Sequence, residues 1–301
     1  MNSLTDCRVQ STALKPRYVV ISPVRDEADN LESTIESLLR QTITPVQWIV
    51  VNDGSTDLTG QILDHYANQI SWIRIVHRDN RGFRQPGGGV IAAFEDGYRA
   101  LGVGDWDYLV KLDGDLSFDP DYFERCFREF DDNQKLGVGG GTIQSLHEGR
   151  KVIEKVPDFH VRGATKIYRR ACWDQLGGLL KAPGWDTLDE VKANMLGWET
   201  KSFADILITQ QRVTGGAQGP WKDSFKNGRA NYICGYHPLF MALKCAKRIF
   251  DRPYFVSFLG LMSGYVSGYL SRAARVNDPE LIHYLRSQQL KRLTFSETIW
   301  K

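Results

Sequence analysis

The sequence predicts an α/β protein in which a mostly parallel, Rossmann-like sheet is flanked by helices and followed by a C-terminal helical region. Short apolar runs alternate with helix-period segments over residues 1–145, which is typical of βαβ units. Acidic or polar residues directly follow several of these runs. After Thr214 the composition shifts to helix-period segments rich in aromatic and basic residues.

Each expected element has its own signal. Apolar runs predict strands at Tyr18–Ser22, Gln47–Asn52, Ile73–His77, Tyr108–Leu112 and Val138–Gln144. Apolar residues at three- and four-residue spacing predict a helix over 28–41. Further helices are expected over 58–68, capped by Ser55 or Asp57, over 90–101 and over 188–196. The glycines at 87–89, which precede the helix expected over 90–101, could offer backbone N–H groups to a phosphate.

Composition excludes several classes of protein. With 301 residues, 42% hydrophobic and 25% charged, the chain can bury a large core, so a disordered or fibrous protein is excluded. Its five cysteines form no CxxC pair, so neither a zinc site nor a disulfide framework is expected. Residues 1–16 are expected to be an N-terminal extension. They carry no signal-peptide pattern, so we expect a cytoplasmic protein.

Charge is distributed unevenly along the chain. Residues 1–200 carry 23 Lys and Arg against 30 Asp and Glu, whereas residues 201–301 carry 15 against 6. A basic and aromatic C-terminal part beside an acidic one suggests a surface that meets anionic lipid, at the cytoplasmic face of a membrane.

One uncharged segment bears on this membrane contact. Residues 253–270 form 18 residues without a charge, at the lower limit for a membrane span, and carry glycines at four-residue spacing. The preceding segment, 238–250, has the pattern of a basic amphipathic helix. Three alternatives stay open for this part: contact with a membrane surface, packing within a helical bundle, and a true span.

Acidic residues mark the expected functional edge of the sheet. Asp113-Gly114-Asp115 follows the fourth apolar run, Asp53 follows the second, and Glu27 lies just after the first. Ligands of open α/β sheets bind outside the carboxyl ends of the strands, so these carboxylates would converge on one site. Neither GxGxxG nor GxxxxGK[ST] occurs, which disfavours a dinucleotide site and a P-loop ATPase.

Three segments in this order, residues 20–27, 49–57 and 112–115, resemble the family-2 glycosyltransferases. These are inverting enzymes with a GT-A fold that use nucleotide-diphosphate sugars. The resemblance implies a GT-A catalytic domain over residues 17–213 and leaves 214–301 as a C-terminal helical region. It further implies a donor that is usually UDP-linked, a saccharide or lipid-linked acceptor in polysaccharide or glycolipid synthesis, and no nucleic acid.

The resemblance also implies roles for single residues. Asp115 would ligate a Mg²⁺ or Mn²⁺ ion that bridges the diphosphate, with Asp113 close to the ribose or to the metal. Such a cation is suited to the negative charge that gathers on the leaving nucleoside diphosphate. The nucleotide would be contacted by Pro23, Glu27, Asp53, Lys111 and Asp113.

An inverting transfer needs a general base on the acceptor side of the sugar. In this family the base is an acidic residue at the start of a helix, ahead of a glycine. The acidic residues in this position are Asp186, Asp189 and Glu190; counting back from Gly197 favours Asp186 as the base, with Asp189 second. The alternative is that Asp186 only caps the start of the helix and takes no part in the chemistry.

Three basic segments have weaker signals. Residues 162–170 resemble the segment that lies along the donor sugar and acceptor, which would involve Arg162 and Gly163; the alternative is a basic edge strand facing solvent. Arg81 and Arg84 could meet phosphates. Residues 289–293 resemble the QxxRW element of polysaccharide synthases, so that Arg292 could reach the diphosphate, or they form an exposed helix end.

Two other functions remain as alternatives. A sugar-phosphate nucleotidyltransferase would need a glycine-rich, Lys- or Arg-bearing loop after the first strand, whereas residues 23–27 are acidic and lack glycine. A non-catalytic module that binds nucleotide sugar or lipid would not need the Asp113/Asp115 pair together with an acidic candidate base.

Overall fold

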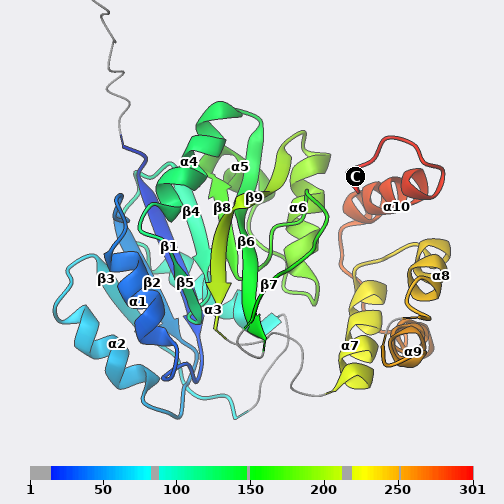
Figure 1. The fold of residues 1–301 in the computed structure, drawn as a ribbon, viewed down its shortest axis with the longest axis horizontal. Helices are drawn as coiled ribbons and strands as arrows, with labels where there is room; N and C mark the ends of the chain where they lie inside the picture. The colour runs from blue at the N-terminus through cyan, green and yellow to red at the C-terminus, as the bar shows by residue number, and fades with distance from the viewer. Residues whose placement is uncertain (1–14, 83–87, 148–149, 212–218, 251, 301) are drawn as a thin grey trace, which may run out of the picture.

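The computed structural model describes residues 15–82, 88–147, 150–211, 219–250 and 252–300 (Figure 1). The strands are β1 (Tyr18–Val24), β2 (Gln47–Asn52), β3 (Ile73–His77), β4 (Tyr108–Leu112), β5 (Leu116–Phe118), β6 (Leu136–His147), β7 (Arg150–Ile153), β8 (Thr165–Arg169) and β9 (Glu199–Gln210). The helices are α1 (Leu31–Leu39), α2 (Thr59–Ala67), α3 (Gly88–Arg99), α4 (Tyr122–Asp132), α5 (Arg170–Leu176), α6 (Trp185–Met195), α7 (Pro220–Ile233), α8 (Pro238–Ala246), α9 (Val256–Leu270) and α10 (Pro279–Leu293).

The strands form one sheet with the order β3-β2-β1-β4-β8-β6-β9-β5, and β7 pairs with β6. β3, β2, β1 and β4 run parallel, as the alternation of apolar runs and helices predicts. Beyond β4 the sheet is mixed, because β8 is antiparallel to both β4 and β6. β8 therefore lies inside the sheet, and the alternative of a solvent-facing edge strand over residues 162–170 is wrong.

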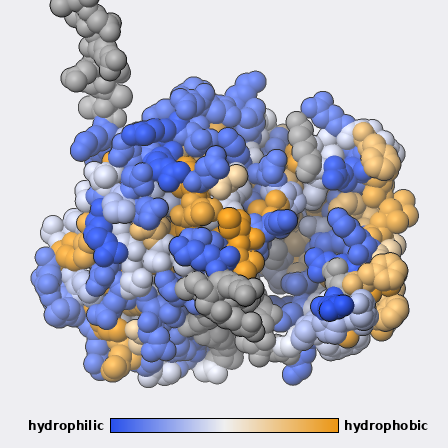
Figure 2. Space-filling view, viewed as in Figure 1, coloured by the Kyte–Doolittle hydropathy of each residue, from blue (hydrophilic) through white to orange (hydrophobic). Residues whose placement is uncertain are grey.

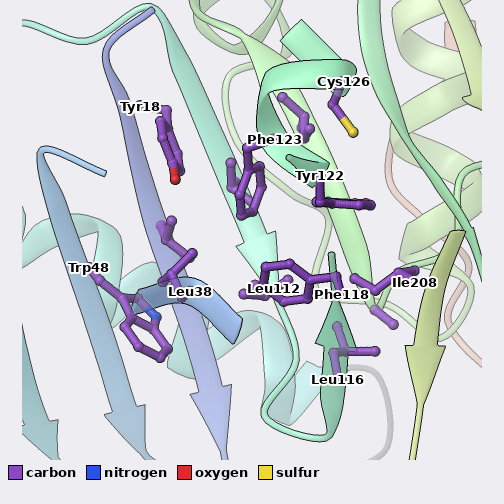
Figure 3. Close-up of a cluster of buried hydrophobic side chains, with 14 of the residues drawn as sticks. Tyr18, Leu38, Trp48, Leu112, Leu116, Phe118, Tyr122, Phe123, Cys126 and Ile208 are labelled. Atoms are coloured by element: carbon purple, nitrogen blue, oxygen red, sulfur yellow. The ribbon is translucent and has the colours of Figure 1, made fainter. Parts of the chain in front are cut away.

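Helices cover both faces of the sheet, with α1, α2 and α4 on one face and α3 and α5 on the other (Figure 1). On the first face Figure 3 shows Tyr18, Trp48, Tyr122 and Phe123 among aliphatic side chains, and the rings of Tyr18 and Phe123 lie 4.9 Å apart. Packed aromatic pairs of this kind contribute about 1 kcal/mol each beyond their buried area. This core fixes the strands whose ends form the site.

The C-terminal helices α7 to α10 lie beside α6 (Figure 1). Leu188 and Val191 of α6 belong to the same buried cluster as Tyr232, Leu261 and Leu285. α6 thus packs between the sheet and the C-terminal helices, so those helices contact the element that carries Asp186.

α7 and α9 touch through their backbones. A Cβ on Gly264 would lie 1.9 Å from the carbonyl oxygen of Phe225, and one on Gly228 would lie 2.0 Å from that of Leu261. The glycine spacing in 253–270 therefore packs a helical bundle, as one of the three alternatives expects. α9 has 15 residues. In the part of the chain that the structure describes, no helix is long and apolar enough to cross a membrane, so the alternative of a span has no support.

Some expectations concern residues outside the described ranges. The predicted boundary at 213/214 lies within 212–218, most of the predicted extension 1–16 lies within 1–14, and Arg84 and Gly87 lie within 83–87. The helix expected over 188–196 begins earlier, at Trp185, after Gly184 with φ 81°. Asp186 is consequently in the first turn of α6.

Candidate functional site

The carboxyl ends of β1, β2 and β4 meet at one edge of the sheet, because the three strands are parallel. The backbone N–H of Asp53 donates to the carbonyl of Val24 at 2.9 Å, which ties the ends of β2 and β1 together. The N–H of Asp113 donates to the carbonyl of Ala164 at 2.8 Å, so the residues before β8 reach the same edge. Asp53 and Asp113 therefore lie at the same edge of the sheet.

The loops after β1 and β2 are joined by hydrogen bonds. The side chain of Asp26 accepts from the N–H of Thr56 at 2.8 Å, and the N–H of Glu27 donates to the hydroxyl of Thr59 at 2.8 Å. Asp26 adopts φ 53°, a left-handed conformation that Asp tolerates better than most residues. Pro23, at the end of β1, and Glu27 are thereby fixed next to the loop that carries Asp53.

Asp53 lies between two guanidinium groups. Arg78 donates to one carboxylate oxygen and Arg81 to the other, each at 2.5 Å, and Arg78 also pairs with Asp96 at 2.9 Å. Arg81, which the sequence suggests for phosphate, is therefore engaged with the carboxylate predicted to contact the base or ribose. Charge-assisted bonds to both oxygens fix the orientation of Asp53.

Lys111 is buried within β4 and organises the turn that follows it. Its ammonium group pairs with Asp113 and donates to the carbonyl of Gly163 at 2.5 Å. The Lys111 side chain is 2% exposed, whereas that of Asp113 is 31% exposed. Lys111 therefore faces Asp113 and Gly163 rather than solvent, and any effect on a nucleotide would act through the position of Asp113.

Asp115 lies between β4 and the end of β9. Its carboxylate accepts from the amide of Gln210 at 3.1 Å, and its residue is 6% exposed. Asp113 and Asp115 carry carboxylate oxygens of the kind that Mg²⁺ or Mn²⁺ prefers, and a cation bound there would take its remaining ligands from phosphate and water. Within the described residues, no group of three or more His, Cys, Asp or Glu side chains could hold a metal by itself.

Gly163 and Asp186 lie against each other. A Cβ on Gly163 would lie 2.9 Å from the Trp185 ring and 3.2 Å from the Cβ of Asp186. The Trp185 ring also has the ammonium groups of Lys111 at 5.6 Å and Lys166 at 5.5 Å from its centroid. Because Lys111 also binds Gly163 and Asp113, the first turn of α6 is held beside the acidic edge of the sheet.

A buried ionic cluster supports this turn from behind. Lys166 on β8 binds Asp189 at 2.7 Å and Glu190 at 2.8 Å, and it also donates to the backbone carbonyl of Asp186. The hydroxyl of Tyr168 donates to Asp189 at 2.5 Å. The ion pairs of Lys166 with Asp189 and Glu190 are not predicted from the sequence. The available signal was a lysine within the apolar run 164–168, because a fully buried lysine needs a carboxylate partner.

The pKa values of several groups in this cluster are shifted from their ordinary values. Burial raises the pKa of Asp189 to about 6, although Lys166 opposes the shift. Burial lowers the pKa of His160, but Glu190, 2.8 Å from its Nδ1, outweighs burial and leaves that pKa above its ordinary value. Burial likewise lowers the pKa of Lys166, and the neighbouring carboxylates more than compensate. Lys166 therefore stays charged, and its charge is balanced inside the protein.

Arg162 and Arg292 are the two remaining arginines of the predicted site. Nε of Arg162 is 2.9 Å from a carboxylate oxygen of Glu154. Arg292 is exposed near the C-terminal end of α10. In the same segment Gln289 is buried and accepts from the N–H of His237 at 2.8 Å, so it holds the start of α8. The proposed contacts of Arg162 with acceptor and of Arg292 with diphosphate stay predictions.

Two curated proteins are similar to part of this chain in sequence. EpsJ of Bacillus subtilis (strain 168), an uncharacterized glycosyltransferase, is 31% identical over 46% of this chain and 37% of its own length. YibD of Escherichia coli (strain K12), also an uncharacterized glycosyltransferase, is 30% identical over 55% of this chain and 42% of its own length. The chain thus spans less than half the length of these relatives.

Two solved structures share the fold across most of the chain. Mannosyltransferase PcManGT from Pyrobaculum calidifontis, in complex with GDP-Man and Mn²⁺, has a TM-score of 0.56 at 15% identity and covers 95% of this chain and 89% of its own. TarS 1–349 from S. aureus, in complex with UDP-GlcNAc, has a TM-score of 0.53 at 17% identity over 91% and 81% of the two chains. The family model described as "Glycosyl transferase family 2" matches residues 19–173, which is more than half of the chain. The chain belongs to glycosyl transferase family 2.

Proposed function

We propose that the protein transfers a sugar from a nucleotide-diphosphate sugar to a hydroxyl group of a saccharide or lipid-linked acceptor, with inversion at the anomeric carbon. The observation that carries the proposal is the meeting of Asp53, Asp113 and Asp115 with the Gly163–Asp186 contact at one sheet edge. Family membership supports a transferase over a sugar-phosphate nucleotidyltransferase. The relatives include chondroitin synthase of Pasteurella multocida (strain Pm70), which favours polysaccharide synthesis.

The donor would bind with its nucleoside toward Asp53 and its diphosphate toward Asp113 and Asp115. The neighbouring structures were solved with GDP-Man and with UDP-GlcNAc, and both donors carry the diphosphate that this arrangement needs. We favour a UDP-linked sugar. Asp113 and Asp115 would hold Mg²⁺ or Mn²⁺, which stabilises the charge of the departing diphosphate when it is bound.

Asp186 would act as the general base. Its carboxylate would take the proton of the acceptor hydroxyl while that oxygen forms a bond to the anomeric carbon. The bond between the anomeric carbon and the diphosphate breaks, and the nucleoside diphosphate leaves with the electron pair. Attack from the side opposite the leaving group inverts the configuration.

The surroundings of the two candidate bases differ. Asp189 is 4% exposed and already binds Lys166 and Tyr168. Asp186 is partly exposed in the first turn of α6, beside Gly163. A base must reach the proton that it abstracts. These contacts support Asp186 as the base and a structural role for Asp189.

A donor panel tests the proposal. Purified protein is incubated with UDP-GlcNAc, UDP-glucose, UDP-galactose and GDP-mannose, each with Mn²⁺, with Mg²⁺ and with EDTA, and nucleotide release is measured. We expect release from one class of donor, lost with EDTA and in Asp115→Ala, whose thermal unfolding should remain cooperative. Binding of a donor without release, in the presence of saccharide and lipid-linked acceptors, would favour the non-catalytic module. Full activity of Asp115→Ala would contradict the metal assignment.

A further inference from the structure

α8 and α9 expose an unusual amount of apolar surface. On α8 and just after it, Leu239, Leu243 and Phe250 follow one another at helical spacing and point outward, while Met241 and Cys245 are buried. Phe250 is 80% exposed. Figure 2 shows hydrophobic residues over α8 along the outer edge of the C-terminal helices. A contiguous apolar surface of this kind marks a contact with a partner or a membrane.

α9 continues the same surface. Its glycine face packs on α7, so Leu259, Val266 and Leu270 lie on the opposite, exposed side. Leu270 is 81% exposed. Tyr254 and Phe255, in the connection between α8 and α9, are also more than half exposed. Aromatic rings of this type prefer the interface between water and acyl chains. We call the exposed apolar residues of α8, the connection and α9 the α8–α9 surface.

The charges beside the α8–α9 surface are basic. Lys247 and Arg248 are exposed at the end of α8, and Arg252 and Arg272 are exposed at the two ends of the α9 segment. Over residues 238–276 the sequence has a single acidic residue, Asp251. An apolar surface bordered by Lys and Arg is complementary to a bilayer that contains anionic lipids, because the apolar groups enter the interface while the cations meet the headgroups.

We propose that the α8–α9 surface docks the protein on an anionic membrane surface without crossing it. Loss of either component should weaken binding, since the apolar and the electrostatic contributions add. The packing of α9 explains why this surface is apolar. Only the glycine face of α9 fits closely against α7, so the apolar side chains on its opposite face stay exposed.

The α8–α9 surface is connected to the candidate base by buried contacts. The hydroxyl of Tyr265 on α9 donates to the carbonyl of Tyr236 at 2.7 Å, and the thiol of Cys234 donates to the carbonyl of Pro183 at 3.0 Å, two residues before α6. Docking would therefore hold the first turn of α6 at a fixed position relative to the bilayer. If the proposed transferase function holds, this geometry favours an acceptor whose lipid part stays in the membrane.

Vesicle flotation tests the docking. The full chain is mixed with vesicles of phosphatidylcholine alone or of phosphatidylcholine with phosphatidylglycerol in equal amounts. We expect flotation with the anionic vesicles that weakens at high salt. Lys247→Glu/Arg248→Glu should lower the apparent affinity at least about tenfold, because each basic residue near an anionic surface contributes roughly a fivefold effect. Phe250→Ser/Leu270→Ser should also lower it, because this variant removes two exposed apolar side chains that would enter the bilayer interface.

Matched controls lie away from the α8–α9 surface. Leu58→Ser removes an apolar side chain that is 59% exposed at the start of α2, and Lys15→Glu/Lys135→Glu reverses two exposed lysines; both should bind as the unchanged protein does. Failure of the unchanged protein to float with anionic vesicles, or equal binding by all variants, would overturn the proposal. Self-association that Phe250→Ser/Leu270→Ser abolishes, without vesicle binding, would overturn it in favour of a second copy.

Nucleotide release from the donor is measured on the same samples, with a water-soluble acceptor. The surface variants should retain this release, because their substitutions lie outside the candidate site. Vesicle binding without release by any sample would count against the proposed function alone, and release without vesicle binding would count against the docking alone.

Discussion

At the scale of the residue, Gly163 joins the acidic edge of the sheet to the first turn of α6. Its carbonyl accepts from Lys111, and its α-carbon faces Trp185 and Asp186. A Cβ there would press on the Trp185 ring and on the Cβ of Asp186, so the start of α6 has to adjust to admit it. The position of the candidate base thus depends on a residue without a side chain.

Gly163→Ala should slow catalysis more than it weakens donor binding. Its Cβ would lie 2.9 Å from the Trp185 ring, and the displacement of Asp186 should lower kcat about 10- to 100-fold. kcat and the donor Kd are measured for Gly163→Ala and for a control, Gly102→Ala. The Cβ of the control would meet nothing closer than 3.5 Å. An unchanged kcat in Gly163→Ala would show that the contact does not control the base.

His160 gives the buried cluster a pH dependence. Because Glu190 raises its folded pKa above the ordinary 6.5, charged His160 stabilises the fold fully below that value, and the contribution is lost as pH rises through the raised pKa. The difference in unfolding free energy between the unchanged protein and His160→Gln should therefore be largest in mild acid and shrink in alkali. Denaturant unfolding at several pH values measures it. A difference that grows with pH would contradict the ion pair with Glu190.

At the scale of the element, α7 and α9 form a closely packed helix pair. Their backbones meet at Gly228 and Gly264, and α9 has no room for a larger residue on that face. This contact also decides which face of α9 is exposed, so packing inside the helical group determines the chemistry of the molecular surface.

Gly264→Ala should destabilise the protein strongly. Its Cβ would lie 1.9 Å from the carbonyl oxygen of Phe225, so the helices must separate, at a cost of about 3 kcal/mol. Gly104→Ala, where a Cβ meets nothing within 4 Å, should change stability by less than about 0.5 kcal/mol. Thermal and denaturant unfolding compare the two. Equal stability of the two variants would exclude the close packing of α7 on α9.

At the scale of the whole molecule, the sequence predicted the parallel half of the sheet well. The runs that form β1 to β4 are apolar, and the intervening segments have helical periodicity, so local pattern determines both. The strand ends that carry the acidic residues also lie at one edge of the sheet, because β1, β2 and β4 are parallel. Asp186 was selected by its spacing from Gly197, and it does lie in the first turn of a helix.

The mixed half of the sheet could not be predicted in the same way. β8 carries Lys166 and Arg169, and its place between β4 and β6 depends on partners distant in sequence. Lys166 can be buried only because Asp189 and Glu190 on α6 neutralise it. Three-dimensional pairing of this kind has no periodic signal in the sequence.

The measurement that tests the central claim most directly compares Asp186→Asn with the unchanged protein in a single-turnover transfer at saturating donor. Removal of the base should lower the rate of sugar transfer about 100- to 10,000-fold and leave the donor Kd within about threefold. Asp189→Asn, measured beside it, should instead lose stability, because it removes a charge from the buried cluster. A transfer rate for Asp186→Asn equal to that of the unchanged protein would contradict the account.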